Sequence, residues 1–316
     1  MVVVCGHCAE MASLHTDWTH PFLLLNQRSA VFGFLILSGY SIAASLKRES
    51  HRYYARRFLR IWPLYLACIA YGAVICLRLP EGIIWNHSPP SPPTTGKEMV
   101  MALLMLQTLF STSPPIVGQI WSLSVEWWHY MIAPRLTSLS WKILVPWIIV
   151  SLYTFAGGPV PAGWEWLING RDEKGLLSLS WLWVSGFVYF KHRGTLLGFL
   201  ILTVPAVYML CTGHFMGKSL FITIVVLLLA EVIPLSAALV PRLNFLGDLS
   251  FPLYLFHIPT MAFLLSFHPT SKWLMPWLMV GSSLLVSLAA LYWVDYPCRR
   301  LFADRPQLLH TGKVAE

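Results

Sequence analysis

The stretch Arg56-Arg57-Phe58-Leu59-Arg60-Ile61-Trp62-Pro63 joins a cluster of positive charges to an apolar run that continues to Ala70. With Lys47, Arg48 and Arg52, its arginines form the densest basic cluster of the chain. In a membrane protein, short loops rich in Lys and Arg remain in the cytoplasm, so this cluster predicts the orientation of the chain. Arginine also matches phosphate oxygens in two-point geometry, which favours a site for a phosphorylated ligand. The stretch by itself leaves both roles open.

The composition is that of a membrane protein. Apolar residues make up 56% of the 316 residues, and charged residues only 11%. Because soluble domains carry about 25% charged residues, we predict an all-α, polytopic transmembrane helical bundle. We see no soluble domain or linker, so we predict one membrane domain over residues 1–316. The net charge of +8 lies mainly in short loops between apolar segments, which indicates membrane topology and argues against nucleic-acid binding.

Spanning helices need roughly 20 apolar residues, and several segments approach that length. They are residues 29–46, 61–79, 119–137, 142–157, 175–190, 195–212, 218–235, 247–267 and 273–294. The run 1–14 is shorter, so we expect a partial first helix or residues missing upstream of Met1. Counting this run, we predict about ten spans. The basic loops 47–60 and 191–193 and the tail 300–316 are expected in the cytoplasm.

In this topology the segment 80–118 begins and ends outside. Its apolar run 99–110, of about 12 residues, is too short to cross and predicts a re-entrant or interfacial helix. The run 88–93 predicts a proline-rich loop.

Ionisable residues inside a bilayer are costly, so those in the apolar segments are candidates for function. His7 and Glu10 lie one helical turn apart, on one face. Glu126 lies among tryptophans, and His257 lies two residues before Pro259. Each has a structural alternative: a hydrogen-bonded packing histidine at position 7, an interfacial carboxylate near the outer surface at 126, and a helix cap at 257.

Other polar residues in these segments favour structural roles. Glu231 lies in a long aliphatic run, which favours a structural or lipid-interface role. Asp295 is expected to pair with Arg299, one turn further on. The small pair Ser38-Gly39 predicts a close approach of two helices.

The tetrapeptide Cys5-Gly6-His7-Cys8 matches the active site of disulfide isomerases. That chemistry needs the motif at a helix N-terminus that follows a strand, in a thioredoxin-like unit. An apolar N-terminal run does not provide those surroundings, so we interpret the match as chance. We find no spacing typical of metal ligands and expect no metal site.

Four runs, in order along nearly the whole chain, resemble the acyltransferase-3 family of integral membrane acyltransferases. Val2-Val3-Val4-Cys5-Gly6-His7 is similar to the end of the family's first helix, with its characteristic histidine. Residues 34–40 and 54–65 are similar to its second-helix and Arg-x-x-Arg signatures. Trp121-Ser122-Leu123-Ser124-Val125-Glu126 matches its Trp-Ser-Leu-x-x-Glu element, and residues 246–259 match its late helix. The family usually carries an Arg and an Asp ahead of the histidine, which this chain lacks, so a misplaced start or a truncated, inactive protein is an open expectation.

The resemblance implies an O-acyltransferase, of the class that transfers groups other than amino-acyl groups. The acyl group, commonly acetyl in this family, would come from cytoplasmic acyl-coenzyme A, a donor substrate and not a permanently bound cofactor. The acceptor would be a hydroxyl of an extracytoplasmic sugar, on a cell-surface glycan such as lipopolysaccharide or on a lipid-linked sugar. The protein would be a multi-pass protein of the bacterial inner membrane, in contact with membrane lipid.

The resemblance also implies roles for single residues. Arg57 and Arg60, supported by Arg56, would hold the donor's phosphates at the cytoplasmic mouth. His7 would act as the general base, and Glu126 would orient that histidine or the acceptor. The substrate-binding residues would be Ser122, Tyr254 and His257.

Two alternatives to an active acyltransferase remain at this point. Helices broken by proline, as at Phe251-Pro252, occur in transporters, so one alternative is a polytopic transporter of glycans or small solutes. The other is a degenerate, non-catalytic member of the family, which the short N-terminus suggests.

Overall fold

A computed structural model describes residues 1–11, 27–79, 93–158, 175–214, 216–234, 236–267 and 274–303. Over these residues the fold is helical, and the only β-type pairing is an isolated bridge between Gln107 and Ser111. The α-helices are α1 (Val2–Met11), α3 (Gln27–Arg48), α4 (Tyr53–Cys76), α5 (Gly96–Leu103), α6 (Trp121–Leu136), α7 (Trp141–Phe155), α9 (Leu176–Lys191), α10 (Leu196–Cys211), α11 (Gly217–Val232), α12 (Val240–Leu265), α13 (Met275–Ala290) and α14 (Tyr296–Ala303). Two short elements complete the described part of the chain, the 3-10 helix η1 (Pro115–Ile120) and the π-helical turn η2 (Leu291–Asp295).

Four helices of the described chain are long and apolar enough to cross a membrane. They span Gln27–Arg48, Tyr53–Cys76, Val240–Leu265 and Met275–Leu301. Shorter apolar helices accompany them, among them α1, α7, α9 and α10. The all-helical membrane architecture is therefore confirmed, whereas the number of about ten spans stays a prediction. The proline-rich run 88–93 and the tail 300–316 fall largely outside the described residues.

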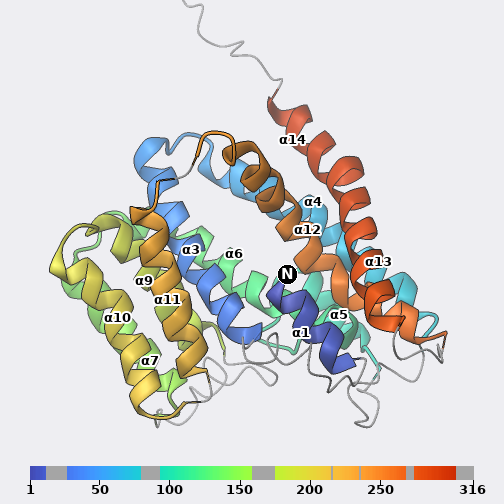
Figure 1. The fold of residues 1–316 in the computed structure, drawn as a ribbon, viewed down its shortest axis with the longest axis horizontal. Coiled ribbons are helices and arrows are strands. Elements are labelled where there is room, and N and C mark those ends of the chain that lie inside the picture. Colours follow the sequence, from blue (N-terminus) through green and yellow to red (C-terminus); the bar gives the residue numbers. More distant parts are fainter. Residues whose placement is uncertain are drawn as a thin grey trace, which may run out of the picture.

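The helices form two groups, and α1 and α6 lie between them (Figure 1). Helices α3, α7, α9, α10 and α11 pack together in one group, and α4, α12 and α13 form the other. Helix α1 contacts α3 on one side and α12 and α13 on the other. Helix α6 contacts α3, α9 and α4. Both helices that carry the predicted catalytic residues therefore lie at the junction of the two groups.

The closest helix contact in the first group is made by two glycines. A Cβ built on Gly39 of α3 would lie 1.9 Å from the carbonyl oxygen of Trp183, and one on Gly186 of α9 would lie 1.9 Å from the carbonyl oxygen of Ile36. Neither position can hold a side chain without separating the two backbones. The close packing predicted from Ser38-Gly39 is therefore confirmed.

Replacing Gly39 with alanine is expected to destabilise the protein by about 1–3 kcal/mol or more, because overpacking against backbone atoms must push α3 away from α9. Thermal unfolding and the monodisperse yield in detergent measure this effect. Gly281→Ala is the matched control, since its added Cβ would have no neighbour within 4 Å. Equal stability of the two variants would contradict the packing argument.

The apolar run 99–110 does not form one helix. Helix α5 begins earlier, at Gly96, because Thr95 and Glu98 form a capping box, and it ends at Leu103. The chain that follows is irregular and is buried at Met105, Gln107 and Thr108. Helix α6 binds it there: Ser124 Oγ donates to the carbonyl of Met105 at 2.8 Å, and Trp128 Nε1 donates to the same carbonyl at 2.9 Å. The predicted extent of this helix was wrong, because side chains of α6 take backbone groups that a longer helix would use.

Helix α12 continues through both of its prolines, which corrects two expectations. His257 lies in its interior and not at a helix end, and the helix is not broken at Pro252. Pro259 has no N–H for the carbonyl of Leu255. Gln119 Nε2 donates to that carbonyl instead, as does Cys68 Sγ at 3.1 Å. Neighbouring helices thus satisfy the freed carbonyl of Leu255. Because α12 is continuous at Pro252, it does not provide the broken helix that suggested a transporter.

Candidate active site

Helix α6 carries a buried polar face made of Ser122, Glu126 and Tyr130. These residues follow one another at intervals of four, so they lie on one side of the helix. Their exposed fractions are 0%, 3% and 6%. In a chain this apolar, such a face must find partners inside the protein.

Glu126 is the centre of one hydrogen-bonded cluster. Its Oε1 atom accepts a hydrogen bond of 2.6 Å from Ser38 Oγ on α3 and another from the hydroxyl of Tyr130. Trp183 Nε1 on α9 donates to Ser38 Oγ at 3.2 Å. The positive charges of Arg60 and Arg57 also act on the carboxylate. Glu126 is therefore buried among α3, α6 and α9, whereas its position near the outer surface of the membrane stays a prediction.

A second group contains the two histidines. His7 on α1 has its Nδ1 atom 3.6 Å from Glu10 Oε2, which confirms that these residues share a face. Helix α12, which packs against α1, carries His257, and the ring centroid of His257 lies 5.3 Å from that of His7. The two residues are 250 positions apart in sequence, and only packing brings them together.

Tyr254 connects the histidines to α6. Its hydroxyl donates to the carbonyl of Gln119 at 2.6 Å and lies 2.6 Å from Ser122 Oγ. Its ring centroid is 6.1 Å from that of His257. The structure thus places Ser122, Tyr254 and His257 in one connected group with His7.

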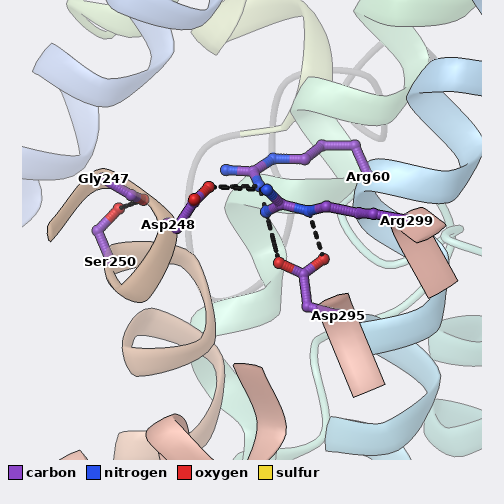
Figure 2. Close-up of polar contacts among 6 residues, drawn as sticks. All are labelled: Arg60, Gly247, Asp248, Ser250, Asp295 and Arg299. Atoms are coloured by element: carbon purple, nitrogen blue, oxygen red, sulfur yellow. Dashed lines mark hydrogen bonds and ion pairs between the residues drawn. The ribbon is translucent and has the colours of Figure 1, made fainter. Parts of the chain in front are cut away.

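Arg60 belongs to a four-residue ion-pair cluster that ties three parts of the chain (Figure 2). Its Nη1 atom lies 3.6 Å from Asp248 Oδ1 on α12 and 3.9 Å from Asp295 Oδ2 on η2. Arg299 on α14 donates to Asp248 Oδ1 at 2.8 Å and to Asp295 Oδ1 at 3.0 Å, as expected for a pair one turn apart. Two guanidinium groups therefore face two carboxylates, and any anionic ligand of Arg60 must compete with Asp248 and Asp295.

Arg57 and Arg56 have different surroundings, although they are adjacent. Arg57 donates to Ser45 Oγ at 3.0 Å, and its guanidinium lies 5.7 Å and 5.8 Å from the ring centroids of Tyr53 and Tyr130. Arg56 instead pairs with Glu49 at 2.9 Å and donates to backbone carbonyls of the α3–α4 connection. Arg57 is thus in contact with the Glu126 cluster through Tyr130, whereas Arg56 holds the loop.

Sequence reasoning missed the partners of Glu126. Ser38 was interpreted only as a packing residue, and Tyr130 and Trp183 were not singled out. The interval of four between Glu126 and Tyr130 was a signal for the second contact. Ser38 and Trp183 lie on other helices, so no spacing in the sequence around Glu126 indicates their contacts with its cluster.

The remaining polar groups are consistent with structural roles. The hydroxyl of Tyr189 donates to the exposed Glu231. Cys5 and Cys8 are free thiols inside α1, and no strand precedes them in the described chain. Within the residues that the structure covers, no group of three or more His, Cys, Asp or Glu side chains is arranged to hold a metal ion.

Apolar helices with a polar site at their junction define an integral membrane protein with buried functional groups. A family model described as an acyltransferase domain matches residues 1–296. The chain therefore belongs to the acyltransferase-3 family and is a membrane acyltransferase by family. No curated protein and no solved structure matches the chain at a significant level.

Proposed function

We propose that this protein is an O-acyltransferase of the bacterial inner membrane. It moves an acyl group, with acetyl as the family's common choice, from cytoplasmic acyl-coenzyme A to a hydroxyl of an extracytoplasmic sugar. The sugar belongs to a cell-surface polysaccharide or a lipid-linked precursor. The C-terminus lies in the cytoplasm in this proposal.

The observation that carries the proposal is a continuous row of polar side chains, here called a file, at the junction of the two helix groups. It starts at Arg57, which contacts the ring of Tyr130, and continues through Glu126 and Ser122 on α6. It then passes to Tyr254, His257 and His7. Eight residues of helix separate Ser122 from Tyr130, or about 12 Å at 1.5 Å per residue. Such a file supports passage of a donor's thioester arm through protein and not through lipid.

The basic loops support the orientation. Lys191 Nζ at the end of α9 donates to the carbonyls of Thr137 and Leu139 in the α6–α7 connection, both at 3.0 Å. The hydroxyl of Tyr53 at the start of α4 donates to the carbonyl of Tyr130 at 3.2 Å. The start of α4, the α6–α7 connection and the end of α9, each with Arg or Lys residues, thus share one end of the bundle, which the positive-inside rule favours for cytoplasmic loops.

His7 is the proposed general base. It accepts the proton of the sugar hydroxyl while the hydroxyl oxygen attacks the thioester carbonyl carbon. The new ester C–O bond forms, the C–S bond breaks, and the coenzyme A thiolate takes the proton from the His7 imidazolium. This leaves neutral His7, a free thiol and the acylated sugar. Ser122 and Tyr254, whose hydroxyls lie in the same connected group, are proposed to bind the acceptor sugar.

Arg57 is proposed to bind the donor's phosphates, because its polar hydrogen-bond partner among the described residues is a single hydroxyl, that of Ser45. Arg60 is proposed to assist it, in competition with the two carboxylates that share its guanidinium. The contacts of Arg56 support a role in the loop rather than at the phosphates. Glu126 has its hydrogen bonds to Ser38 and Tyr130, which supports a positioning role for the polar face of α6.

The test uses purified protein in lipid vesicles with acetyl-coenzyme A and a sugar acceptor. The proposal expects acceptor-dependent release of coenzyme A, and mass spectrometry of surface polysaccharide should show an acyl mass that depends on the gene. Arg57→Ala should raise the KM for acetyl-coenzyme A about tenfold or more, the effect of about 1.4 kcal/mol of lost charge-assisted binding. Its effect on the KM for the sugar should be small.

Arg48→Ala is the matched control, since it removes the same charge at the end of α3, beside the α3–α4 connection. An equal rise in KM would show that Arg57 contributes only net charge. Movement of sugar or solute without consumption of acetyl-coenzyme A would favour a transporter, and a folded protein with neither activity would favour a degenerate family member.

A further inference from the structure

His257 is a fully buried histidine in the interior of α12, with an exposed fraction of 0%. Its Nδ1 atom lies 2.8 Å from the carbonyl oxygen of Tyr254 and 3.1 Å from that of Leu253. Carbonyl oxygens only accept hydrogen bonds, so Nδ1 carries the proton. The other nitrogen of the neutral ring, Nε2, then has a lone pair and can only accept.

This lone pair has no hydrogen-bond partner among the residues that the structure describes. A buried acceptor without a partner is uncommon in folded proteins and calls for an explanation. The neighbouring ring is that of His7, at 5.3 Å between centroids and tilted by 34°. Two imidazoles joined by an N–H···N bond of about 3 Å have centroids about 5 Å apart, since each nitrogen lies about 1 Å from its own centroid. The centroid spacing is therefore that of two bonded rings, although their nitrogens do not meet the geometry of a hydrogen bond in this structure.

We infer that His257 is the positioning residue of His7. Its Nε2 atom accepts the N–H of His7 that takes no part in proton transfer. It thereby orients the His7 ring and stabilises the imidazolium that forms when His7 takes a proton. The inference rests on the proposed function, in which His7 is the base. It assigns to His257 a role that sequence reasoning considered for Glu126.

The choice of a neutral acceptor has a physical reason. A buried carboxylate beside His7 would favour the charged imidazolium strongly and keep it protonated before the sugar arrives. A neutral imidazole stabilises the same cation less strongly and still supports it during transfer. Glu10 is the rival acceptor, but its side chain is 45% exposed and lies 3.6 Å from His7 Nδ1, beyond a normal hydrogen bond.

Among the described residues, the titratable or charged groups on the elements around the histidine pair come from four helices. They are Glu10, Cys5, Cys8 and the chain's N-terminal amino group on or next to α1, Arg28 on α3, Cys68 and Tyr71 of α4, which contact Leu255 and Thr260 of α12, and Tyr254 on α12. The side of α13 that meets α1 presents the carbonyl of Pro276 and the sulfur of Met279 to Cys8. Of these groups, Glu10 is the one that competes directly for His7.

The test measures kcat, KM and the pH–rate profile of His257→Phe in vesicles with acetyl-coenzyme A. We expect kcat to fall about tenfold or more, within the range for general-base support, with little change in the KM for acetyl-coenzyme A. The acid limb of the profile should move to lower pH, because protonated His7 loses its acceptor. His257→Gln, which keeps an acceptor oxygen near the position of Nε2, should restore part of kcat and return the limb toward its original position.

His129→Phe is the matched control. His129 is equally buried on α6, but its nitrogens lie 2.6 Å from the carbonyl of Val125 and 2.9 Å from Ser180 Oγ, so both have partners. This variant should reduce the amount of folded protein without moving the acid limb.

The inference would be overturned if an active His257→Phe variant kept the acid limb of the pH–rate profile at its wild-type pH. It would also be overturned if Glu10→Gln moved that limb further than His257→Phe does. If His257→Phe does not fold, the limb of His257→Gln decides between the same outcomes. A wild-type protein that consumes no acetyl-coenzyme A would instead refute the proposed function and the inference with it.

Discussion

Replacing His7 with alanine is expected to reduce acyl transfer by about 10²–10⁴-fold, the usual contribution of a general base. The reason is positional. His7 is the titratable group on α1 that contacts the ring of His257, and through it the hydroxyls of Tyr254 and Ser122. The loss should appear in kcat, because the proposed donor site at the basic end of the bundle does not include α1.

The variant must remain folded for this result to have meaning, and Cys8→Ala is the control for α1. Cys8 Sγ contacts the carbonyl of Pro276 at 3.7 Å and Met279 Sδ at 3.8 Å, so its removal weakens the packing of α1 on α13 without touching the base. We expect Cys8→Ala to retain most activity. Added imidazole should restore part of the activity of His7→Ala. Full activity of His7→Ala would show that another group is the base.

Replacing Glu126 with alanine is expected to have the largest effect on stability. It removes the carboxylate that accepts from the hydroxyls of Ser38 and Tyr130, and because these hydroxyls lie 3.2 Å apart, one can donate to the other while the second loses its acceptor. Each unsatisfied buried group costs about 1–3 kcal/mol, to which the cavity adds. Acyl transfer should fall as well, since the polar face of α6 loses its connection to α3.

A double-mutant cycle with Ser38→Ala measures this cluster. Because the two side chains share a hydrogen bond, their effects on the free energy of unfolding should be non-additive by about 0.5–3 kcal/mol. Thermal or denaturant unfolding in detergent provides the measurement. Glu231→Ala is the control, because that carboxylate also accepts from a tyrosine, Tyr189, but is exposed, so water replaces it. Additive effects in the cycle would refute the cluster as a single unit.

Much of the candidate site could be predicted because its members are polar residues within apolar segments, where polar groups are costly. His7, Glu126 and His257 stand out in apolar segments, and helical spacing relates His7 to Glu10 and Asp295 to Arg299. Hydropathy and charge are local properties, so they indicate which residues must find partners. They do not indicate which partners those are.

Helix boundaries were less predictable where side chains from elsewhere compete for the backbone. The run 99–110 is apolar enough for a helix, yet Ser124 and Trp128 of α6 bind its carbonyls and α5 ends at Leu103. In α12 the reverse holds: Pro259 predicts an interruption, and Gln119 removes the cost by bonding the freed carbonyl of Leu255.

The sequence by itself therefore determined the membrane class and the family, because each follows from composition and short ordered motifs, and its basic loops predict the orientation. The tertiary structure alone decided that Glu126 bonds Ser38 and Tyr130, that Arg60 faces Asp248 and Asp295, and that His257 meets His7. The physical reason is that these contacts depend on the rotation and depth of helices that pack across long sequence separations. A helix presents the same polar face whatever its neighbour, and only packing selects the neighbour.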